Sequence, residues 1–245
     1  MIEVADLYKS FNEVKALQGV SFTAPDGQIT GLLGPNGAGK TTTLRILYTI
    51  IRQDGGAARV DGFDTLAQPL QVQRSIGALP ENQGLYPRLT ARENIRYYGR
   101  LHGLRGADLE SRIDHLASLL EMEDFLERRT EGFSMGQRVK VAIARALVHN
   151  PGNVILDEPT AGLDVMSTRS MRTFIRRIKD EGQCVLFSSH IMQEVSALCD
   201  NIIILQAGKV VASGAPEQLL LQTGQANLED AFVAAIGTEE GLVRA

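Results

Sequence analysis

The chain has 245 residues, of which 44% are hydrophobic and 22% are charged, as in a globular protein with room for a buried core. The net charge of −4 argues against a nucleic-acid-binding surface. Cys184 and Cys199 lack metal-ligand spacing, so reduced thiols in or near the core are expected. No apolar run approaches the ~20 residues that span a bilayer, and residues 1–4 do not resemble a signal peptide. We therefore expect a soluble protein.

The first 33 residues alternate short strand-like runs with turns, which predicts an antiparallel piece of sheet. Phe11 lies in this region, about two dozen residues ahead of a glycine-rich loop. An aromatic ring at that place can stack on an adenine base, although Tyr8 competes for the role and a core position is the alternative.

The glycine-rich loop has the pattern G-x-x-x-x-G-K-[ST] between the apolar run 29–33 and an amphipathic helix. Glycines let backbone N–H groups turn inward on a phosphate chain, and the start of the helix adds a positive dipole end. Lys40 is expected to reach the β- and γ-phosphates, and the Thr41 hydroxyl to bind Mg²⁺. The predicted nucleotide-binding residues of this loop are Gly34, Pro35, Asn36, Gly37, Ala38, Gly39, Lys40, Thr41 and Thr42.

Further along the chain, strands are predicted near 58–62 and 76–79, then a mostly helical insert over 84–148, then strands at 154–156 and 184–187. Thr90 and Glu93 have the spacing of a capping box. Strands that alternate with helices indicate an α/β fold with a parallel sheet.

Carboxylates follow the predicted strand 154–156. Asp157 at the carboxyl end of a buried parallel strand can bind Mg²⁺, and Glu158 can deprotonate the attacking water as a general base. His190 ends another predicted strand and can donate to the γ-phosphate. The histidines at 102, 115 and 149 are expected to be surface or capping residues.

Ser134 suits the N-cap of the next helix, whose first N–H groups would form a second anion site. One chain does not need two such sites for one nucleotide. A second copy of the protein would need it, if each copy contributes one site across an interface.

Over essentially its whole length the chain resembles the nucleotide-binding subunits of ABC transporters. The resemblance rests on Phe11, the loop 34–42, the signature 133–137, Asp157-Glu158, the dimer-contact loop 161–164 and His190, in the family's order. It implies a P-loop NTPase with a RecA-like parallel-sheet core (1–83 and 149–224), an N-terminal antiparallel β subdomain, an inserted helical subdomain (84–148) and a C-terminal helical tail (225–245).

The resemblance also implies ATP hydrolysis, with ATP and Mg²⁺, by a head-to-tail dimer. Ser134, Gly136, Gln137 and Asp164 of one chain would close over the nucleotide held by the other. The membrane partner, a permease, would dock on the insert near Tyr86-Pro87.

Two positions depart from the family pattern. Met135 stands where the signature normally has glycine, which puts the geometry and rate of closure in question. The glutamine usually found between core and insert falls by spacing at Glu81, a possible Mg²⁺ ligand, with Gln83 as a displaced candidate.

Within the family, the strings 84–90 and 228–232 resemble exporter ATPases with separate permeases, nearest to the sodium-extrusion group, with drug and antibiotic exporters close behind. Such a subunit would lie at the cytoplasmic face of the plasma (inner) membrane, held there by the permease. The alternatives are a soluble ABC ATPase that does not transport, which usually carries a second cassette or basic arms, and a regulator that binds ATP without turnover.

Overall fold

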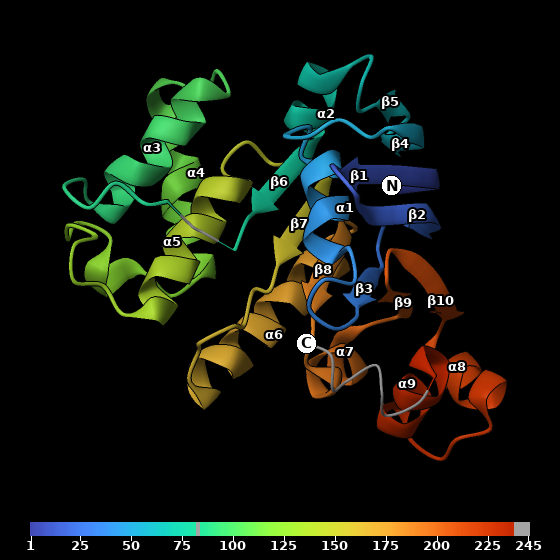
Figure 1. Cartoon of the computed structure of the whole chain (residues 1–245). Coiled ribbons are helices and arrows are strands. Elements are labelled where there is room, and N and C mark those ends of the chain that lie inside the picture. Colours follow the sequence, from blue (N-terminus) through green and yellow to red (C-terminus); the bar gives the residue numbers. More distant parts are fainter. Residues whose placement is uncertain (82–83, 238–245) are drawn as a thin grey trace.

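The computed structural model describes residues 1–81 and 84–237, and its centre is a six-stranded sheet with the order β10-β9-β3-β8-β7-β6 (Figure 1). Strands β9, β3, β8, β7 and β6 run parallel to their neighbours in this list, and β10 pairs antiparallel with β9. The strands are β3 (Ile29–Leu33), β6 (Ile76–Leu79), β7 (Asn153–Asp157), β8 (Cys184–Ser189), β9 (Asn201–Gln206) and β10 (Lys209–Gly214). The predicted parallel core is confirmed.

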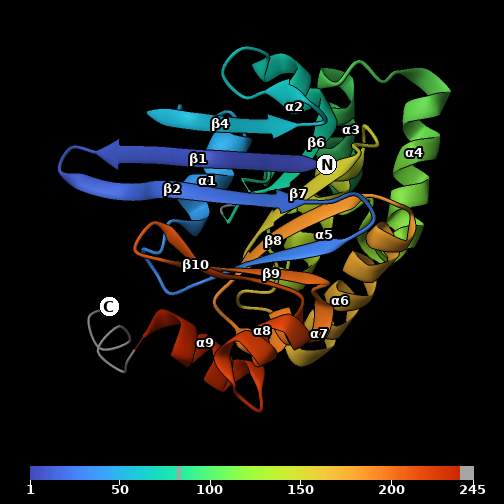
Figure 2. The ribbon, with the colours of Figure 1, turned by 90° about the vertical axis from the view of Figure 1, so that its right-hand side faces the viewer.

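A second, antiparallel sheet covers one side of the core, with the order β2-β1-β4-β5 (Figure 2). Its strands are β1 (Ile2–Phe11), β2 (Val14–Ala24), β4 (Gly55–Val60) and β5 (Phe63–Asp64). The predicted N-terminal antiparallel piece is thus confirmed, with strands longer than the sequence runs suggested.

Helices cover both faces of the parallel sheet because its strands are apolar on both sides. Along β3, Leu32 faces one hydrophobic cluster with helix α1, whereas Ile29 and Leu33 face the other with α6 and α7. The covering helices are α1 (Lys40–Leu47), α2 (Pro69–Ser75), α6 (Val165–Asp180) and α7 (Met192–Leu198), followed by α8 (Pro216–Thr223) and α9 (Leu228–Ile236). Helix α1 packs between the two sheets.

The segment between β6 and β7 forms the predicted helical insert, which stands to one side of the sheet (Figure 1). It contains α3 (Ala91–Leu101), α4 (Gly106–Leu119), the 3₁₀ turn η1 (Glu123–Phe125) and α5 (Met135–Leu147). The capping box is confirmed: the Thr90 hydroxyl accepts from the Glu93 N–H and the Glu93 carboxylate accepts from the Thr90 N–H. The exact subdomain boundaries stay a prediction.

The order of the central strands decides where the polar residues meet. Strand β8 lies between β3 and β7, and Ser189 pairs with Leu33 while Ser188 pairs with Asp157. Because parallel strands end at one edge, the loops after β3, β7 and β8 emerge side by side. Among the described residues, no helix is long and apolar enough to cross a membrane.

Candidate active site

The phosphate loop, residues 34–42, joins β3 to α1 with glycines where side chains do not fit. A Cβ on Gly34 would lie 2.4 Å from a carbonyl oxygen of β9, and one on Gly39 would lie 2.9 Å from a carbonyl oxygen of β2. Gly37 and Gly39 have φ angles of 79° and 106°, which favour glycine. Backbone shaped in this way can approach a phosphate chain closely.

Lys40 begins α1 and is only 6% exposed. Its Nζ donates to the carbonyl oxygens of Gly34 (2.6 Å) and Pro35 (3.2 Å) and lies 3.9 Å from Oε1 of Glu158. Burial lowers the pKa of Lys40, and the carboxylates of Glu158 and Asp157 oppose that shift. An ammonium folded back on its own loop can exchange these carbonyls for phosphate oxygens, which accept stronger charge-assisted hydrogen bonds.

Asp157 ends β7 and is 3% exposed. Burial raises the pKa of Asp157 and the neighbouring Glu158 and Glu81 raise it further, while hydrogen bonds from the Ser188 hydroxyl (2.6 Å) and Thr41 lower it. A cation relieves such crowding of carboxylates, and carboxylate and hydroxyl oxygens are ligands that Mg²⁺ prefers. The predicted Mg²⁺ ligands Thr41 and Asp157 therefore fit the ion; the structure places Glu81 near them and exposed.

Glu158 follows Asp157 with a φ of 48°, in the left-handed region that side chains seldom adopt. Its backbone N–H donates to the Ser188 hydroxyl (3.0 Å), and its Oε2 lies 3.0 Å from Nδ1 of His190. The carboxylate is 14% exposed whereas the imidazole is 52% exposed. A shielded carboxylate held by an imidazole at the mouth of the site can accept a proton from water. The structure thus brings the two predicted catalytic residues together.

Phe11 is the last residue of β1, 45% exposed, and pairs with Val14 across the β1–β2 hairpin. Two residues further along β2, Ala16 contacts Gly39, so the hairpin that carries Phe11 packs against the phosphate loop. Tyr8 instead packs over glycines of β2 and β4. This placement favours Phe11 over Tyr8, and adenine stacking stays a prediction.

The signature lies at the start of α5. The Ser134 hydroxyl accepts from the Gln137 N–H (3.3 Å), and Gln137 Oε1 accepts from the Ser134 N–H (3.1 Å), which confirms Ser134 as the N-cap. A Cβ on Gly136 would lie 2.8 Å from Oγ of Ser167. Ser167 in turn donates to the carboxylate of Asp164, the N-cap of α6 (2.8 Å). The signature and the 161–164 loop of one chain are therefore in contact.

Gln83 lies outside the described residues. The expectation that His149 is a plain surface or capping residue is wrong: its ring stacks on that of His102 at 3.6 Å, and its Nε2 lies 3.0 Å from the Ile76 carbonyl oxygen. Burial lowers the pKa of His149 to about 4, with His102 and Arg112 adding to the shift. No sequence pattern signals such a pair, since the two histidines lie just beyond the C-terminal ends of different helices, α3 and α5.

Ser188 was also missed. It looks like an ordinary strand residue, yet its hydroxyl donates to Asp157 and accepts from the Glu158 N–H. The only available signal is its place in the polar end of a buried strand, two residues before His190.

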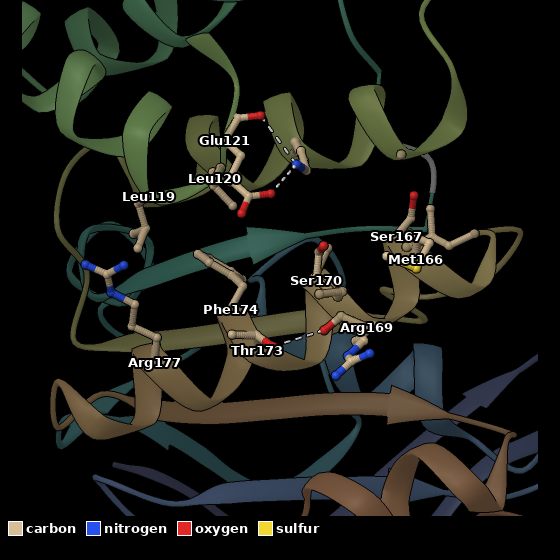
Figure 3. A pocket seen from close by; sticks show the side chains of 14 residues that line it. Leu119, Leu120, Glu121, Met166, Ser167, Arg169, Ser170, Thr173, Phe174 and Arg177 are labelled. Atoms are coloured by element: carbon tan, nitrogen blue, oxygen red, sulfur yellow. Dashed lines mark hydrogen bonds and ion pairs between the residues drawn. The ribbon is translucent and has the colours of Figure 1, made fainter. Parts of the chain in front are cut away.

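A cavity of about 370 Å³ lies away from the phosphate loop, between the insert and α6 (Figure 3). Phe174 of α6 points toward Leu119 and Leu120 of the insert. Lys140 and Glu121, which also line the cavity, form an ion pair at 3.4 Å. The cavity reaches Gly136 at the start of the signature-bearing helix α5.

The fold and the strand-end loops define a P-loop nucleotide hydrolase. Residues 17–161 match the family model described as "ABC transporter". The chain is 44% identical to the ABC transporter ATP-binding protein NatA of Bacillus subtilis (strain 168), over 96% of this chain and 98% of that protein. The chain therefore belongs to the ABC transporter ATP-binding family, and it is an ATPase.

Other similar proteins include LnrL, a linearmycin resistance ATP-binding protein of Bacillus subtilis (strain 168), with 31% identity over 96% of this chain and 78% of that protein. Among solved structures, an ATP-binding subunit of an ABC transporter has a TM-score of 0.89 and 30% identity, over 97% of this chain and 100% of that one. The ATP-binding cassette MJ0796, a dimer bound to ADP and Pi, has a TM-score of 0.79 and 26% identity, over 88% of this chain and 98% of that one.

Proposed function

We propose that this ATPase powers export through a separate membrane permease, from the cytoplasmic face of the membrane, with sodium ions as the leading cargo. The observation that carries the proposal is the likeness to NatA along nearly the whole of both chains. A drug or antibiotic as cargo is supported as well, because LnrL and the daunorubicin/doxorubicin resistance protein DrrA of Streptomyces peucetius, 36% identical, are also similar.

In the proposed reaction, residues of the phosphate loop and Lys40 bind the β- and γ-phosphates and orient the terminal phosphoryl group. Glu158 accepts a proton from the attacking water, and His190 keeps the carboxylate in place and donates to the γ-phosphate. Thr41 and Asp157 would hold Mg²⁺, which, when bound, neutralises charge on the phosphate oxygens.

The second half of the site is proposed to come from a second copy. Ser134, Gly136 and Gln137 of one chain, together with Asp164, would close over the nucleotide that the other chain holds. The dimeric MJ0796 cassette supports this arrangement, as does the position of the signature at a helix N-terminus, where backbone N–H groups favour an anion.

The proposed permease site is the hollow of about 360 Å³ between the core and the insert, whose lining residue Arg145 interacts electrostatically with Tyr86. Ile50 and His102 line it, and Leu101 beside it is 64% exposed. Its described lining residues include no carboxylate, and apolar side chains exposed to this extent beside a concave surface suit an apolar partner helix.

The test is affinity purification of the tagged protein from detergent-solubilised native membranes, with copurifying proteins identified by mass spectrometry. A stoichiometric membrane protein with several spans is expected, and proteoliposomes containing the pair should move ²²Na⁺ or a drug when ATP is supplied. Leu101→Glu should prevent copurification, whereas Leu221→Glu on α8, also exposed, should not. Recovery of ribosomal or assembly proteins instead would favour the soluble alternative.

A further inference from the structure

A buried carboxylate lies behind the candidate active site. Glu194, in the first turn of α7, is only 4% exposed and lies four residues after His190. Its Oε2 accepts a hydrogen bond from the Thr160 hydroxyl and a second from the Ser189 hydroxyl at 3.3 Å. Both hydroxyl-bearing residues are themselves buried.

Each of these donors belongs to a segment that carries a candidate catalytic residue. Thr160 lies two residues after Glu158, and its carbonyl oxygen accepts from the Leu163 N–H (3.1 Å) at the start of the turn toward Asp164. Ser189 directly precedes His190, and its hydroxyl also accepts from the Ile191 N–H (3.0 Å).

The segment that carries Glu158 and the segment that carries His190 are therefore linked by two separate sets of hydrogen bonds. At the edge of the sheet, Ser188 joins β8 to Asp157 and Glu158. Behind it, Glu194 joins the segment after Glu158 to the segment around His190. The same two segments also make the 3.0 Å contact between Glu158 and His190. A shift of either segment would change that contact, because the backbone of Glu158 is held in the left-handed region and cannot relax freely.

We propose that Glu194 is a positioning residue for ATP hydrolysis. It fixes the general-base segment, the histidine segment and the start of the dimer-contact loop relative to one another, so that Glu158 and His190 move as one unit. The proposal rests on the proposed roles of Glu158 and His190. If the role of Glu194 is purely structural, variants that weaken its hydrogen bonds should be less stable but should keep their kcat. If it is a positioning role, such variants should have a lower kcat than a control variant of equal stability.

The sharpest test compares Thr160→Val with Thr65→Val. Each change removes one buried hydroxyl hydrogen bond and keeps the shape of the side chain; Thr65 lies far from the site in the sequence and donates to Gln53 at 3.4 Å. Thr160→Val should lower kcat about tenfold with KM for ATP within about twofold, since small misplacements of reacting groups cost rate rather than binding. Thr65→Val should leave kcat unchanged at a similar midpoint of thermal unfolding.

Glu194 itself is tested by Glu194→Gln and Glu194→Ala in the same assay. The amide of Gln still offers an oxygen to both hydroxyls, so we expect a smaller loss of kcat than the roughly 100-fold loss expected for Ala. Thr160→Val added to Glu194→Ala should lower kcat little further, because both changes remove the same hydrogen bond between Thr160 and Glu194.

Unchanged kcat in Thr160→Val and Glu194→Gln would overturn the proposal, as would an equal loss in Thr65→Val. If Glu194→Ala does not fold, the pair of threonine variants decides alone. Glu158→Gln in the same series distinguishes failure of the proposed catalytic roles from failure of the positioning role. Full activity of Glu158→Gln would contradict the proposed roles of Glu158 and His190. Full activity of the Glu194 and Thr160 variants, with Glu158→Gln inactive, would contradict the positioning role alone.

Discussion

The two halves of the candidate site differ in how they are held. At the strand ends, polar groups are bonded to one another: Lys40 to carbonyl oxygens, Asp157 to Ser188, Glu158 to His190. All of these side chains except that of His190 are buried or largely shielded from solvent. At the start of α5 and α6 the caps are also satisfied, but the neighbouring apolar side chains face solvent. Val165 is 83% exposed and Met166 is 69% exposed.

This difference indicates which half of the site has all its interaction partners within one chain. Groups at the strand ends already have the partners and the burial that tune a reacting site. Exposed apolar side chains beside a helix N-terminus are instead the composition of a surface that another protein covers. Binding and chemistry should therefore respond to changes at the strand ends, and assembly should respond to changes at the signature.

The largest effect is expected from Glu158→Gln. The amide cannot take a proton, so kcat should fall by about 100-fold or more, while ATP affinity stays within about threefold. Steady-state phosphate release measures kcat, and calorimetric titration measures the ATP affinity. Size-exclusion chromatography with ATP should show an accumulated dimer. Turnover at the unmutated rate would remove Glu158 as the base; Glu217→Gln on the exposed side of α8 is the control.

Lys40→Ala should weaken the binding of ATP. The ammonium is expected to exchange its loop carbonyls for phosphate oxygens, and hydrogen bonds between charged groups contribute about 1.5–3 kcal/mol. We expect the Kd for a non-hydrolysable ATP analogue to rise about 10- to 100-fold. Lys209→Ala on the exposed strand β10 should leave it unchanged. An unaltered Kd for Lys40→Ala would contradict the phosphate-cradle model of this half.

The strand-end half was largely predictable from sequence, for a physical reason. Buried parallel strands are short continuous apolar runs, and the residues that end them must lie at one edge, which brought Asp157, Glu158 and His190 to the phosphate loop. The order of the strands was not predictable, and it is the position of β8 between β3 and β7 that brings Ser188 to Asp157.

What the sequence did not reveal depends on contacts between distant elements. The joint from Thr160 to Glu194 spans 34 residues, and the stack of His102 on His149 joins α3 to the residues after α5. Neither has a periodicity or a motif. Helix α2 was also missed, because its seven residues are too few for an amphipathic pattern to stand out.

At the signature half, Gly136→Ala should lower kcat about tenfold and leave analogue binding to the single chain within about twofold. The added Cβ would lie 2.8 Å from the Ser167 hydroxyl, so it should displace the cap that Asp164 makes on α6 and, with it, the surface proposed to meet a second copy. Gly152→Ala is the matched control, since its Cβ would have an ordinary contact at 3.6 Å. Weakened analogue binding in Gly136→Ala would mean that nucleotide binding to the strand-end half of the site also depends on the signature half.

The smallest effect is expected at the junction of core and insert, where His149 contacts Ile76 of β6 and His102 of the insert. Its pKa is about 4 in the folded chain against 6.5 for a free imidazole, so the unfolded chain binds more protons between these values. Stability should therefore fall as pH drops from 6.5 toward 4. For a partly exposed ring this loss is about 1 kcal/mol after allowance for screening.

The measurement is chemical unfolding of the unmutated chain, His149→Gln and His115→Gln at pH 7 and pH 4.5. Gln keeps a donor for the Ile76 carbonyl oxygen but does not titrate, so His149→Gln should lose less stability on acidification than the unmutated chain does. His115→Gln, at an exposed position of α4, should follow the unmutated chain. If all three lose the same stability, His149 does not contribute to the loss, and acid would act on the core and the insert separately rather than on the contact between them.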